Sequence, residues 1–161
     1  MRRINPDHIS KLKELMNRGP FYRLLLMELC DVEMGFSRVL ATLKNEHLNP
    51  FGIVHGGAYS SMIDTAAYWS AYCELDEGVG LTTIDLSVNF LSMAKEGLVL
   101  IEGRSIKVGR SICVTEAYAR DEGGKLLAHG TSKLMVLQGR QTIDSAIEAL
   151  GYSTLPPKFL E

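Results

Sequence analysis

The sequence predicts an α+β fold in which one long central helix is wrapped by a curved antiparallel β-sheet. Its 161 residues are the size of one domain, which we expect to span residues 1–161. The segment from Gly57 to about Cys73 is apolar on nearly every side of a helical wheel, and four strand-like segments follow it. Such a helix must be covered on most sides, and a strongly twisted sheet can do this.

The first part of the chain predicts a helix and a β-hairpin. Asn5 followed by Pro6 is typical of a helix N-cap, so a helix is expected over residues 5–18, ending at Gly19-Pro20. Alternating side chains then predict two strands, from about 25 to 34 and from 36 to 43, joined at Gly35. The core of the domain is expected to run from about 21 to 137.

The second part predicts four more strands and a short helix. Short turns rich in glycine separate the strands, and such connections usually join antiparallel neighbours, so a four-stranded meander is expected. A helix capped by Thr142 is expected from about 140 to 151, and residues 153–161, with two adjacent prolines, are expected to be loose. The expected strands are residues 81–90, 98–108, 111–120 and 125–137.

Composition and charge exclude several classes of protein. Lys and Arg number 17 against 19 Asp and Glu, so the basic surplus of a nucleic-acid-binding protein is absent. Three widely spaced cysteines, Cys30, Cys73 and Cys113, argue against a disulfide framework and a zinc site. The sequence has no signal-peptide pattern and no apolar run of 18 residues, so a cytoplasmic protein without a membrane partner is expected.

Asp64 is the first candidate for a functional residue. It is the only Asp, Glu, Lys or Arg between Leu48 and Cys73. Removing an unpaired carboxylate from water costs several kcal/mol and raises its pKa, so a carboxylate in such a helix is a functional candidate. The alternative is a structural role, in which Asp64 faces solvent or caps a backbone turn.

The turn before this helix predicts an anion-binding helix start. Gly56 and Gly57 leave the first backbone N–H groups unobstructed, and the helix dipole favours negative charge there. An N–H group in this position can act as an oxyanion donor. Gly56 lies roughly 12 Å from Asp64 along the helix axis, and a neighbouring subunit supplying one of the two groups would allow a shorter distance.

A metal site is the competing interpretation of this region. His47, His55 and Asp64 are potential ligands, but the two histidines lie eight apart across a proline-glycine loop, and no further ligand is evident. We therefore expect no metal, and we interpret His55 as a residue that holds the loop through hydrogen bonds. The glycines of this turn do not form a phosphate-binding motif.

The segment from Asn49 to Gly57, followed eight residues after Gly56 by Asp64, resembles the signature of hotdog-fold acyl-CoA thioesterases. The closest resemblance is to the phenylacetate-degradation (PaaI-like) type, related to the 4-hydroxybenzoyl-CoA thioesterases. The resemblance extends to residues 85–90, 108–110 and 121–128. It implies the hotdog fold, homodimers with a continuous sheet that often pair into homotetramers, and active sites shared between subunits.

The resemblance also implies roles for individual residues. Asp64 would act as a nucleophile or as a general base on water, and the Gly56 N–H would polarise the thioester carbonyl. Asn49 would orient the water or the thioester, and His55 would support the loop. Thr83 corresponds to a hydroxyl that positions water in some relatives, although it is equally an ordinary β-branched strand residue.

Coenzyme A would enter as part of the substrate, and no separate cofactor is expected. Its phosphates call for basic or hydrogen-bonding groups near the site. Arg104 and Lys107 lie close to the expected turn at Val108-Gly109. Basic residues there are equally consistent with a solvated strand edge. The residues expected to bind coenzyme A are Gly57, Val108, Gly109, Arg110 and Ser111.

Three functions fit these observations. The leading hypothesis is hydrolysis of an aryl- or medium-chain acyl-CoA to the free acid and CoA. The alternatives are an acyl-CoA-binding sensor and a hydratase or dehydratase of the same fold. The acyl group is not specified, because the aromatic and apolar residues near Asp64 are equally consistent with core packing. They are Phe51, Tyr59, Met62, Tyr68 and Trp69.

Overall fold

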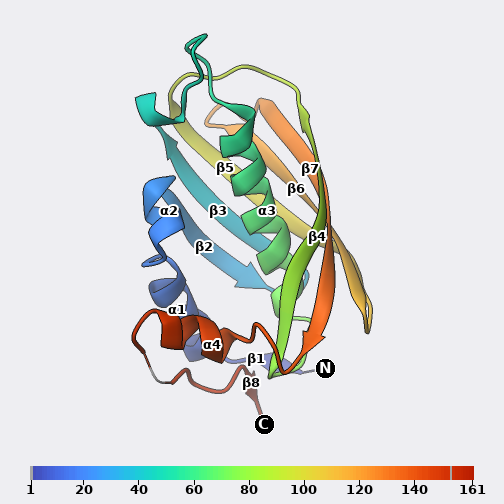
Figure 1. The fold of residues 1–161 in the computed structure, drawn as a ribbon. Helices are drawn as coiled ribbons and strands as arrows, with labels where there is room; N and C mark the ends of the chain where they lie inside the picture. The colour runs from blue at the N-terminus through green and yellow to red at the C-terminus, as the bar shows by residue number, and fades with distance from the viewer. Residues whose placement is uncertain (1, 153) are drawn as a thin grey trace.

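The computed structural model describes residues 2–152 and 154–161. In it, a six-stranded antiparallel sheet curves around helix α3 (Gly56–Tyr72), as Figure 1 shows. The expected α+β architecture of a long central helix wrapped by a sheet is therefore confirmed. In spatial order the strands are β2 (Met27–Glu33), β3 (Phe36–Leu43), β5 (Gly97–Val108), β6 (Ile112–Asp121), β7 (Leu126–Gln138) and β4 (Val79–Phe90).

The expected four-stranded meander is wrong at its first strand. Strands β5, β6 and β7 are consecutive neighbours, but β4 pairs with β7 at the edge of the sheet. The segment between β4 and β5 crosses the open end of the curved sheet, where Val54 N donates a hydrogen bond to Ala94 O at 2.9 Å. A short connection can join distant strands here because the sheet bends around the helix.

The core lies between α3 and the concave face of the sheet. Met62, Ile63 and Ala66 of α3 are completely buried. Full burial of each large apolar side chain contributes about 1.5–3 kcal/mol to stability, so this contact is the main stabilising interaction of the fold. The fully buried sheet residues that pack in the same cluster include Val39, Val99, Ile101, Ala117 and Leu127.

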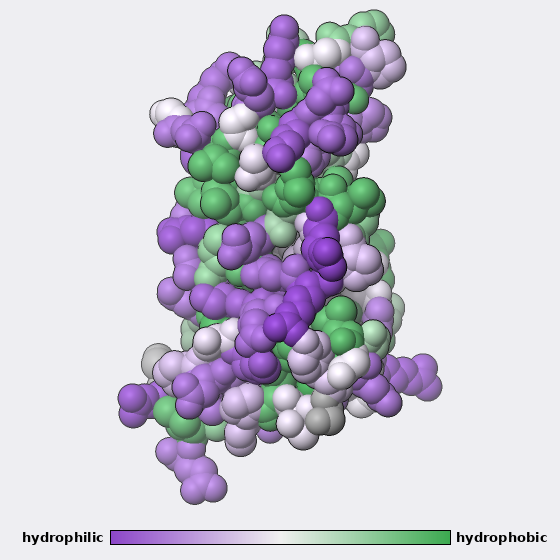
Figure 2. Space-filling view, turned by 90° about the vertical axis from the view of Figure 1, so that its left-hand side faces the viewer, coloured by the Kyte–Doolittle hydropathy of each residue, from purple (hydrophilic) through white to green (hydrophobic). Residues whose placement is uncertain are grey.

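Two helices precede the sheet, and the sequence indicated only the first. Helix α1 (Pro6–Met16) begins as expected, because the Asn5 side chain accepts a hydrogen bond from Asp7 N at 3.1 Å. The short helix α2 (Pro20–Leu24) begins at the proline where the first helix was expected to have ended. Figure 2 shows a band of apolar side chains across the face that carries α2, where Phe21, Leu24 and Leu26 are exposed.

Helix α4 (Ile143–Ala149) is held against the first residues of β4. Its N-cap is Thr142, as expected, whose hydroxyl accepts a hydrogen bond from Ser145 N at 3.4 Å. The chain leading to α4 crosses β4 at Gly80, where a Cβ atom would lie 2.0 Å from the Arg140 carbonyl oxygen. Residue 80 must therefore be glycine for α4 to take this position.

The C-terminal tail is docked, so the expectation of a loose segment is wrong for residues 154–161; Ser153 lies outside the described residues. Strand β8 (Phe159–Leu160) pairs with β1 (Arg3–Ile4). The Lys158 side chain is 2% exposed, and its Nζ donates to the carbonyl oxygens of Tyr72 and, at 2.7 Å, Leu75. The last carbonyl groups of a helix lack partners within the helix, and this buried ammonium group is a donor to the last carbonyl of α3, at Tyr72, and to the Leu75 carbonyl in the turn that follows.

Among the described residues, no helix is long and apolar enough to cross a membrane.

We predict that Lys158→Ala lowers the free energy of unfolding by about 2 kcal/mol, because it removes two hydrogen bonds from a charged donor to buried carbonyl groups. Urea denaturation followed by circular dichroism measures this change. Lys125→Ala is the matched control, since the Lys125 side chain is exposed. Equal stability of the two variants would show that the Lys158 hydrogen bonds do not stabilise the fold.

Candidate active site

Asp64 lies in the middle of α3, half-buried, and faces strand β4. Its Oδ1 accepts a hydrogen bond from the Thr83 hydroxyl at 2.8 Å. Burial raises the pKa of the Asp64 carboxyl above its ordinary value, and the Thr83 hydrogen bond opposes this rise only in part. A carboxylate with one neutral donor and a raised pKa is suited to accept a proton or attack an electrophile near neutral pH.

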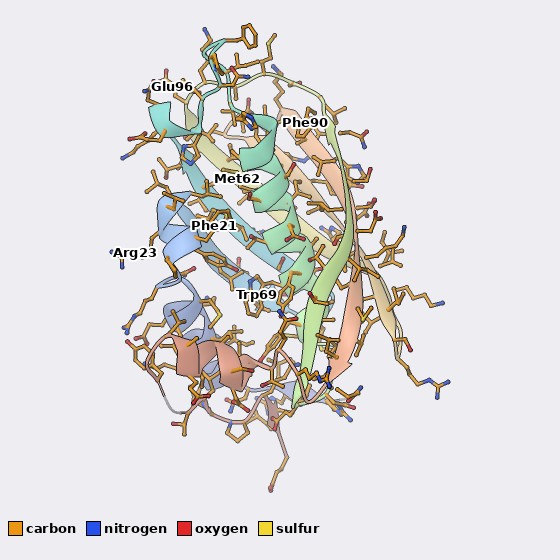
Figure 3. All side chains as sticks on the ribbon, in the orientation of Figure 1. Phe21, Arg23, Met62, Trp69, Phe90 and Glu96 are labelled. Atoms are coloured by element: carbon orange, nitrogen blue, oxygen red, sulfur yellow. The ribbon has the colours of Figure 1, made fainter. Side chains whose placement is uncertain are left out.

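The Asp64 carboxylate borders a cavity of about 390 Å³ between α3, β4 and the terminal helices. Most of its wall is apolar or aromatic, and it includes Phe21 of α2 and Trp69 of α3, whose side chains are labelled in Figure 3. Pockets of this size and composition commonly bind small organic groups. The aromatic residues of the wall are Phe21, Tyr22, Tyr68, Trp69 and Tyr72.

The first turn of α3 has a free backbone donor. The His55 ring is the N-cap, and its Nδ1 accepts a hydrogen bond from Gly57 N at 2.8 Å. Within residues 2–152 and 154–161, the N–H of Gly56 has no hydrogen-bond acceptor. The Phe90 ring covers this residue so closely that a Cβ on Gly56 would lie 2.9 Å from it. His55 thus holds the loop, Gly57 is occupied, and Gly56 offers its N–H.

The Asn49 side chain is used within the turn that leads to α3. Its Oδ1 accepts hydrogen bonds from Phe51 N at 2.9 Å and Ile53 N at 3.3 Å. Asn49 and Gly56 border a second cavity of about 370 Å³, together with Tyr59 and Phe90. A direct contact of Asn49 with substrate would therefore use its amide nitrogen, because the oxygen already caps the turn.

One chain brings the expected catalytic residues together only in pairs. Asp64 and Thr83 are hydrogen-bonded, and Asn49 shares a cavity with Gly56. The two cavities share no lining residue. The Gly56 N–H and the Asp64 carboxylate of one chain therefore do not face the same space.

Four of the five residues expected to bind coenzyme A lie at the turn between β5 and β6, whereas Gly57 lies in the first turn of α3. Val108, Gly109 and Arg110 border a groove that shares Leu75 and Val79 with the Asp64 cavity. Ser111 and Lys107 are exposed beside this turn. Arg104 lies apart from them, with its guanidinium 5.4 Å from the Phe36 ring centroid.

The sequence indicated only part of the cavity wall. Tyr68 and Trp69 border the Asp64 cavity, whereas Met62 is core and Phe51 is 87% exposed. Phe21, Tyr22 and the residues of α4 were missed, because they lie far from Asp64 in the sequence and follow no spacing rule. The pairing of Pro20 with an aromatic segment was the single available signal of a helix there.

No group of three or more His, Cys, Asp or Glu within the described part of the chain is placed to hold a metal ion. His47, one of the candidate ligands, is buried, and its Nε2 donates to Leu25 O at 2.9 Å.

Comparison with known proteins identifies the family. Residues 51–128 match the family model of the thioesterase superfamily. A protein of Saccharolobus solfataricus named as a putative esterase is 30% identical over 120 residues, which cover 74% of this chain and 79% of the relative. The chain belongs to the thioesterase superfamily. Human acyl-coenzyme A thioesterase 13 is 24% identical to this superfamily member over 126 residues, covering 76% and 89% of the two chains.

The structure of this thioesterase-superfamily chain has the hotdog fold. A crystal structure of a thioesterase from Haemophilus influenzae superimposes with a TM-score of 0.77 at 21% identity, covering 87% of this chain and 97% of that one. The resemblance to hotdog-fold thioesterases and the expectation of a thioester-hydrolysing enzyme are therefore confirmed at the level of the family. The matched segment contains Asp64, Gly56 and Thr83, whereas α1, α2 and α4 lie outside it.

We predict that Asp64→Asn raises the melting temperature at pH 7. Burial raises the Asp64 pKa on folding, so the folded state binds this proton more tightly, and stability falls as pH rises from the unfolded to the folded pKa. Asparagine removes the buried charge and can still accept from Thr83. The difference in melting temperature between Asp64→Asn and the wild type should shrink at about pH 3, because Asp64 is protonated and uncharged there.

Differential scanning fluorimetry across this pH range measures the effect. Asp76→Asn serves as control. Arg2 lowers the pKa of the exposed Asp76 carboxyl, so loss of that charge should not raise the melting temperature. A melting temperature of Asp64→Asn below that of the wild type at pH 7 would contradict the proposed burial cost.

Proposed function

We propose that this protein is an acyl-CoA thioesterase that hydrolyses the thioester to a free acid and CoA. The observation that carries the proposal is the half-buried Asp64 carboxylate, with its raised pKa, at the edge of an apolar cavity. Membership of the thioesterase superfamily and the name of the related human acyl-coenzyme A thioesterase support it. The cavity would receive the acyl group and place its carbonyl carbon near the carboxylate.

The chemistry needs a base or nucleophile and an oxyanion donor. Asp64 either removes a proton from the attacking water or attacks the carbonyl carbon itself, and Thr83 holds the carboxylate in place. The developing negative charge on the carbonyl oxygen is stabilised by the Gly56 N–H at the positive end of the α3 dipole. The carbon–sulfur bond then breaks, and the CoA thiolate leaves and takes up a proton. Attack by water gives the free acid directly, whereas attack by Asp64 gives a mixed anhydride that a water molecule then hydrolyses to the free acid and the regenerated carboxylate.

A second copy of the chain is proposed to complete the site. The Asp64 and Gly56 cavities of one chain are separate, and β4 is an edge strand of the sheet. Strand β4 leaves Ile84 exposed at its middle, next to Thr83, and Phe90 exposed at its end, against Gly56. A homodimer formed through this edge would bring Gly56 of one subunit toward Asp64 of the other. Two such dimers would form the homotetramer that the family resemblance implies.

The turn between β5 and β6 is proposed to bind the phosphates of coenzyme A. Arg110 and Ser111 are exposed there, and the adjoining groove leads to the Asp64 cavity through Leu75 and Val79. The guanidinium of Arg110 offers charge-assisted hydrogen bonds to phosphate oxygens.

We predict that Asp64→Asn lowers kcat by about 10²- to 10⁴-fold while acyl-CoA binding persists, because the amide cannot act as base or nucleophile. Thiol release over a panel of aryl- and fatty acyl-CoA substrates measures kcat, and fluorescence titration measures binding. An unchanged kcat would refute the assignment.

Thr83→Val is the companion variant, since it keeps the side-chain shape and removes the donor to Asp64. Loss of that hydrogen bond raises the Asp64 pKa further, so the acid limb of the kcat profile should move to higher pH.

We predict that two inactive variants restore activity when their subunits are mixed. Gly56→Ala keeps the backbone N–H, but its Cβ would lie 2.9 Å from the Phe90 ring, so we expect it to displace the donor. In a dimer of Asp64→Asn with Gly56→Ala, one site is intact if Asp64 and Gly56 come from different subunits. Random reassociation of equal amounts after denaturation should then give about a quarter of the wild-type rate. Each variant refolded alone is the control. Absence of restored activity, with mixed dimers present by mass spectrometry, would show that both groups come from one subunit.

A further inference from the structure

Part of the wall of the Asp64 cavity comes from segments of the chain outside the superfamily match. Helix α2 contributes Phe21 and Tyr22, and the segment leading into α4 and α4 itself contribute Gln141, Ile143 and Ala146. The α3 and β4 side of the cavity therefore belongs to the matched segment, and the residues from α1, α2 and α4 belong to the terminal segments.

The position of α4 is fixed by the backbone. The chain crosses β4 at Gly80, and Gln141 adopts a φ of 47°, a left-handed conformation that is uncommon for a residue with a side chain. This turn directs Ile143 and Ala146 toward α3. Consequently, α4 forms a fixed wall of the cavity.

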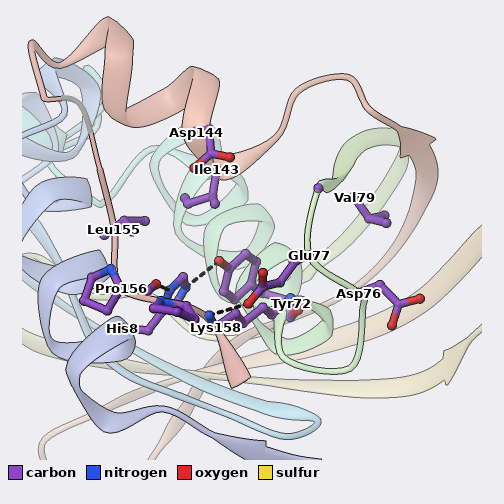
Figure 4. Close-up of a pocket in the computed structure, with 12 residues that line it drawn as sticks. His8, Tyr72, Asp76, Glu77, Val79, Ile143, Asp144, Leu155, Pro156 and Lys158 are labelled. Atoms are coloured by element: carbon purple, nitrogen blue, oxygen red, sulfur yellow. Dashed lines mark hydrogen bonds between the residues drawn. The ribbon is translucent and has the colours of Figure 1, made fainter. Parts of the chain in front are cut away.

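A partition closes the cavity on the side of the C-terminal tail. The cavity beside this tail has a volume of about 260 Å³, and we call it the tail cavity (Figure 4). Three residues border both the Asp64 cavity and the tail cavity, namely Tyr72, Val79 and Ile143. The Tyr72 hydroxyl donates to His8 Nε2 at 2.8 Å, and His8 Nδ1 donates to Pro156 O at 2.6 Å. The Tyr72 side of the partition is thus anchored by hydrogen bonds, whereas its Ile143 side is held by apolar contacts.

The lining of the cavity offers little to a charged acyl group. Trp69 Nε1 donates to the Tyr22 hydroxyl at 2.7 Å, and the Tyr72 hydroxyl is bound to His8. These polar atoms are already paired, so the ring surfaces face the cavity. A carboxylate at the end of an acyl group would lose its hydration here without gaining a basic partner from the cavity lining, which contains no Lys, Arg or His.

We propose that the Asp64 cavity binds an uncharged, apolar acyl group, and that Ile143 and Ala146 of α4 determine how large this group can be. The proposal rests on the proposed thioesterase function and adds the substrate class and its specificity-determining residues. The small side chain of Ala146 leaves room beside the aromatic residues of α3, and Ile143 separates the Asp64 cavity from the tail cavity.

The first test compares Ala146→Phe with Ala149→Phe. Both substitutions enlarge an alanine of α4, but Ala149 is exposed and borders none of these cavities. Thiol release is measured with acetyl-, butyryl-, octanoyl-, phenylacetyl- and succinyl-CoA. For Ala146→Phe we expect kcat/KM to fall about 10- to 100-fold for octanoyl- and phenylacetyl-CoA and to change less than about twofold for butyryl-CoA.

Ala149→Phe should retain the wild-type profile, and succinyl-CoA should be a poor substrate for every variant. The proposal is overturned if Ala146→Phe retains the wild-type profile, if it loses activity equally toward all substrates, or if succinyl-CoA is hydrolysed as well as butyryl-CoA.

Ile143→Ala tests the same wall in the opposite direction and avoids overpacking. Its smaller side chain joins the two cavities, so kcat/KM for dodecanoyl-CoA relative to octanoyl-CoA should rise about 10-fold. An unchanged ratio would show that Ile143 does not limit the acyl group.

A binding measurement separates this proposal from the proposed function. Trp69 is the only tryptophan of the chain, and it lines the cavity. Titration of the Asp64→Asn protein with octanoyl-CoA should change the tryptophan fluorescence, whereas CoA alone should not. If the protein hydrolyses no thioester but octanoyl-CoA still changes the signal, the catalytic proposal fails and the binding proposal stands. Equal signals from CoA and octanoyl-CoA would overturn the binding proposal.

Discussion

Helix α3 carries apolar side chains on nearly every side, and all of them must be kept from water. The concave sheet covers one side of the helix, and the terminal helices approach the other side. These terminal helices do not fill all of the space, so an apolar cavity remains along α3. The cavity is thus a consequence of how the helix is covered, and Asp64 lies where the sheet edge, the helix and the cavity meet.

Two charged groups beside α3 differ in what surrounds them. Lys158 lies at the end of α3 with two carbonyl acceptors, and it joins the tail to the helix. Burial disfavours the charge of both groups, since it lowers the pKa of Lys158 to about 8 and raises the pKa of Asp64. The Lys158 ammonium group is enclosed by backbone acceptors, whereas the Asp64 carboxylate has the Thr83 hydroxyl as its partner and borders an open cavity. The same helix therefore carries a structural contact at its end and a reactive group at its centre.

Local patterns predicted most of the fold. The cap at Asn5, the central helix and the strand boundaries follow from short-range preferences, which depend on neighbouring residues. The position of β4 and the docking of Lys158 depend on partners far away in the sequence, so no local pattern revealed them. The same distinction holds at the site, where Asp64 and Gly56 belong to one compact motif. Tyr22 and Ala146 border the cavity from opposite ends of the chain, and only the folded structure brings them together.

The pairing of β1 with β8 places Arg3 directly beside Leu160. The two ends of the described chain therefore meet on one side of the molecule, away from the first turn of α3 (Figure 1). A short glycine-rich linker would span this gap, and the exposed turn at Gly123-Gly124 offers a place for new ends. Such a circularly permuted chain would keep the sheet, the central helix and the cavity. Its terminal segments, including α4, α1 and α2, would be synthesised before α3, so they could cover this helix before β4, β5 and β6 are made.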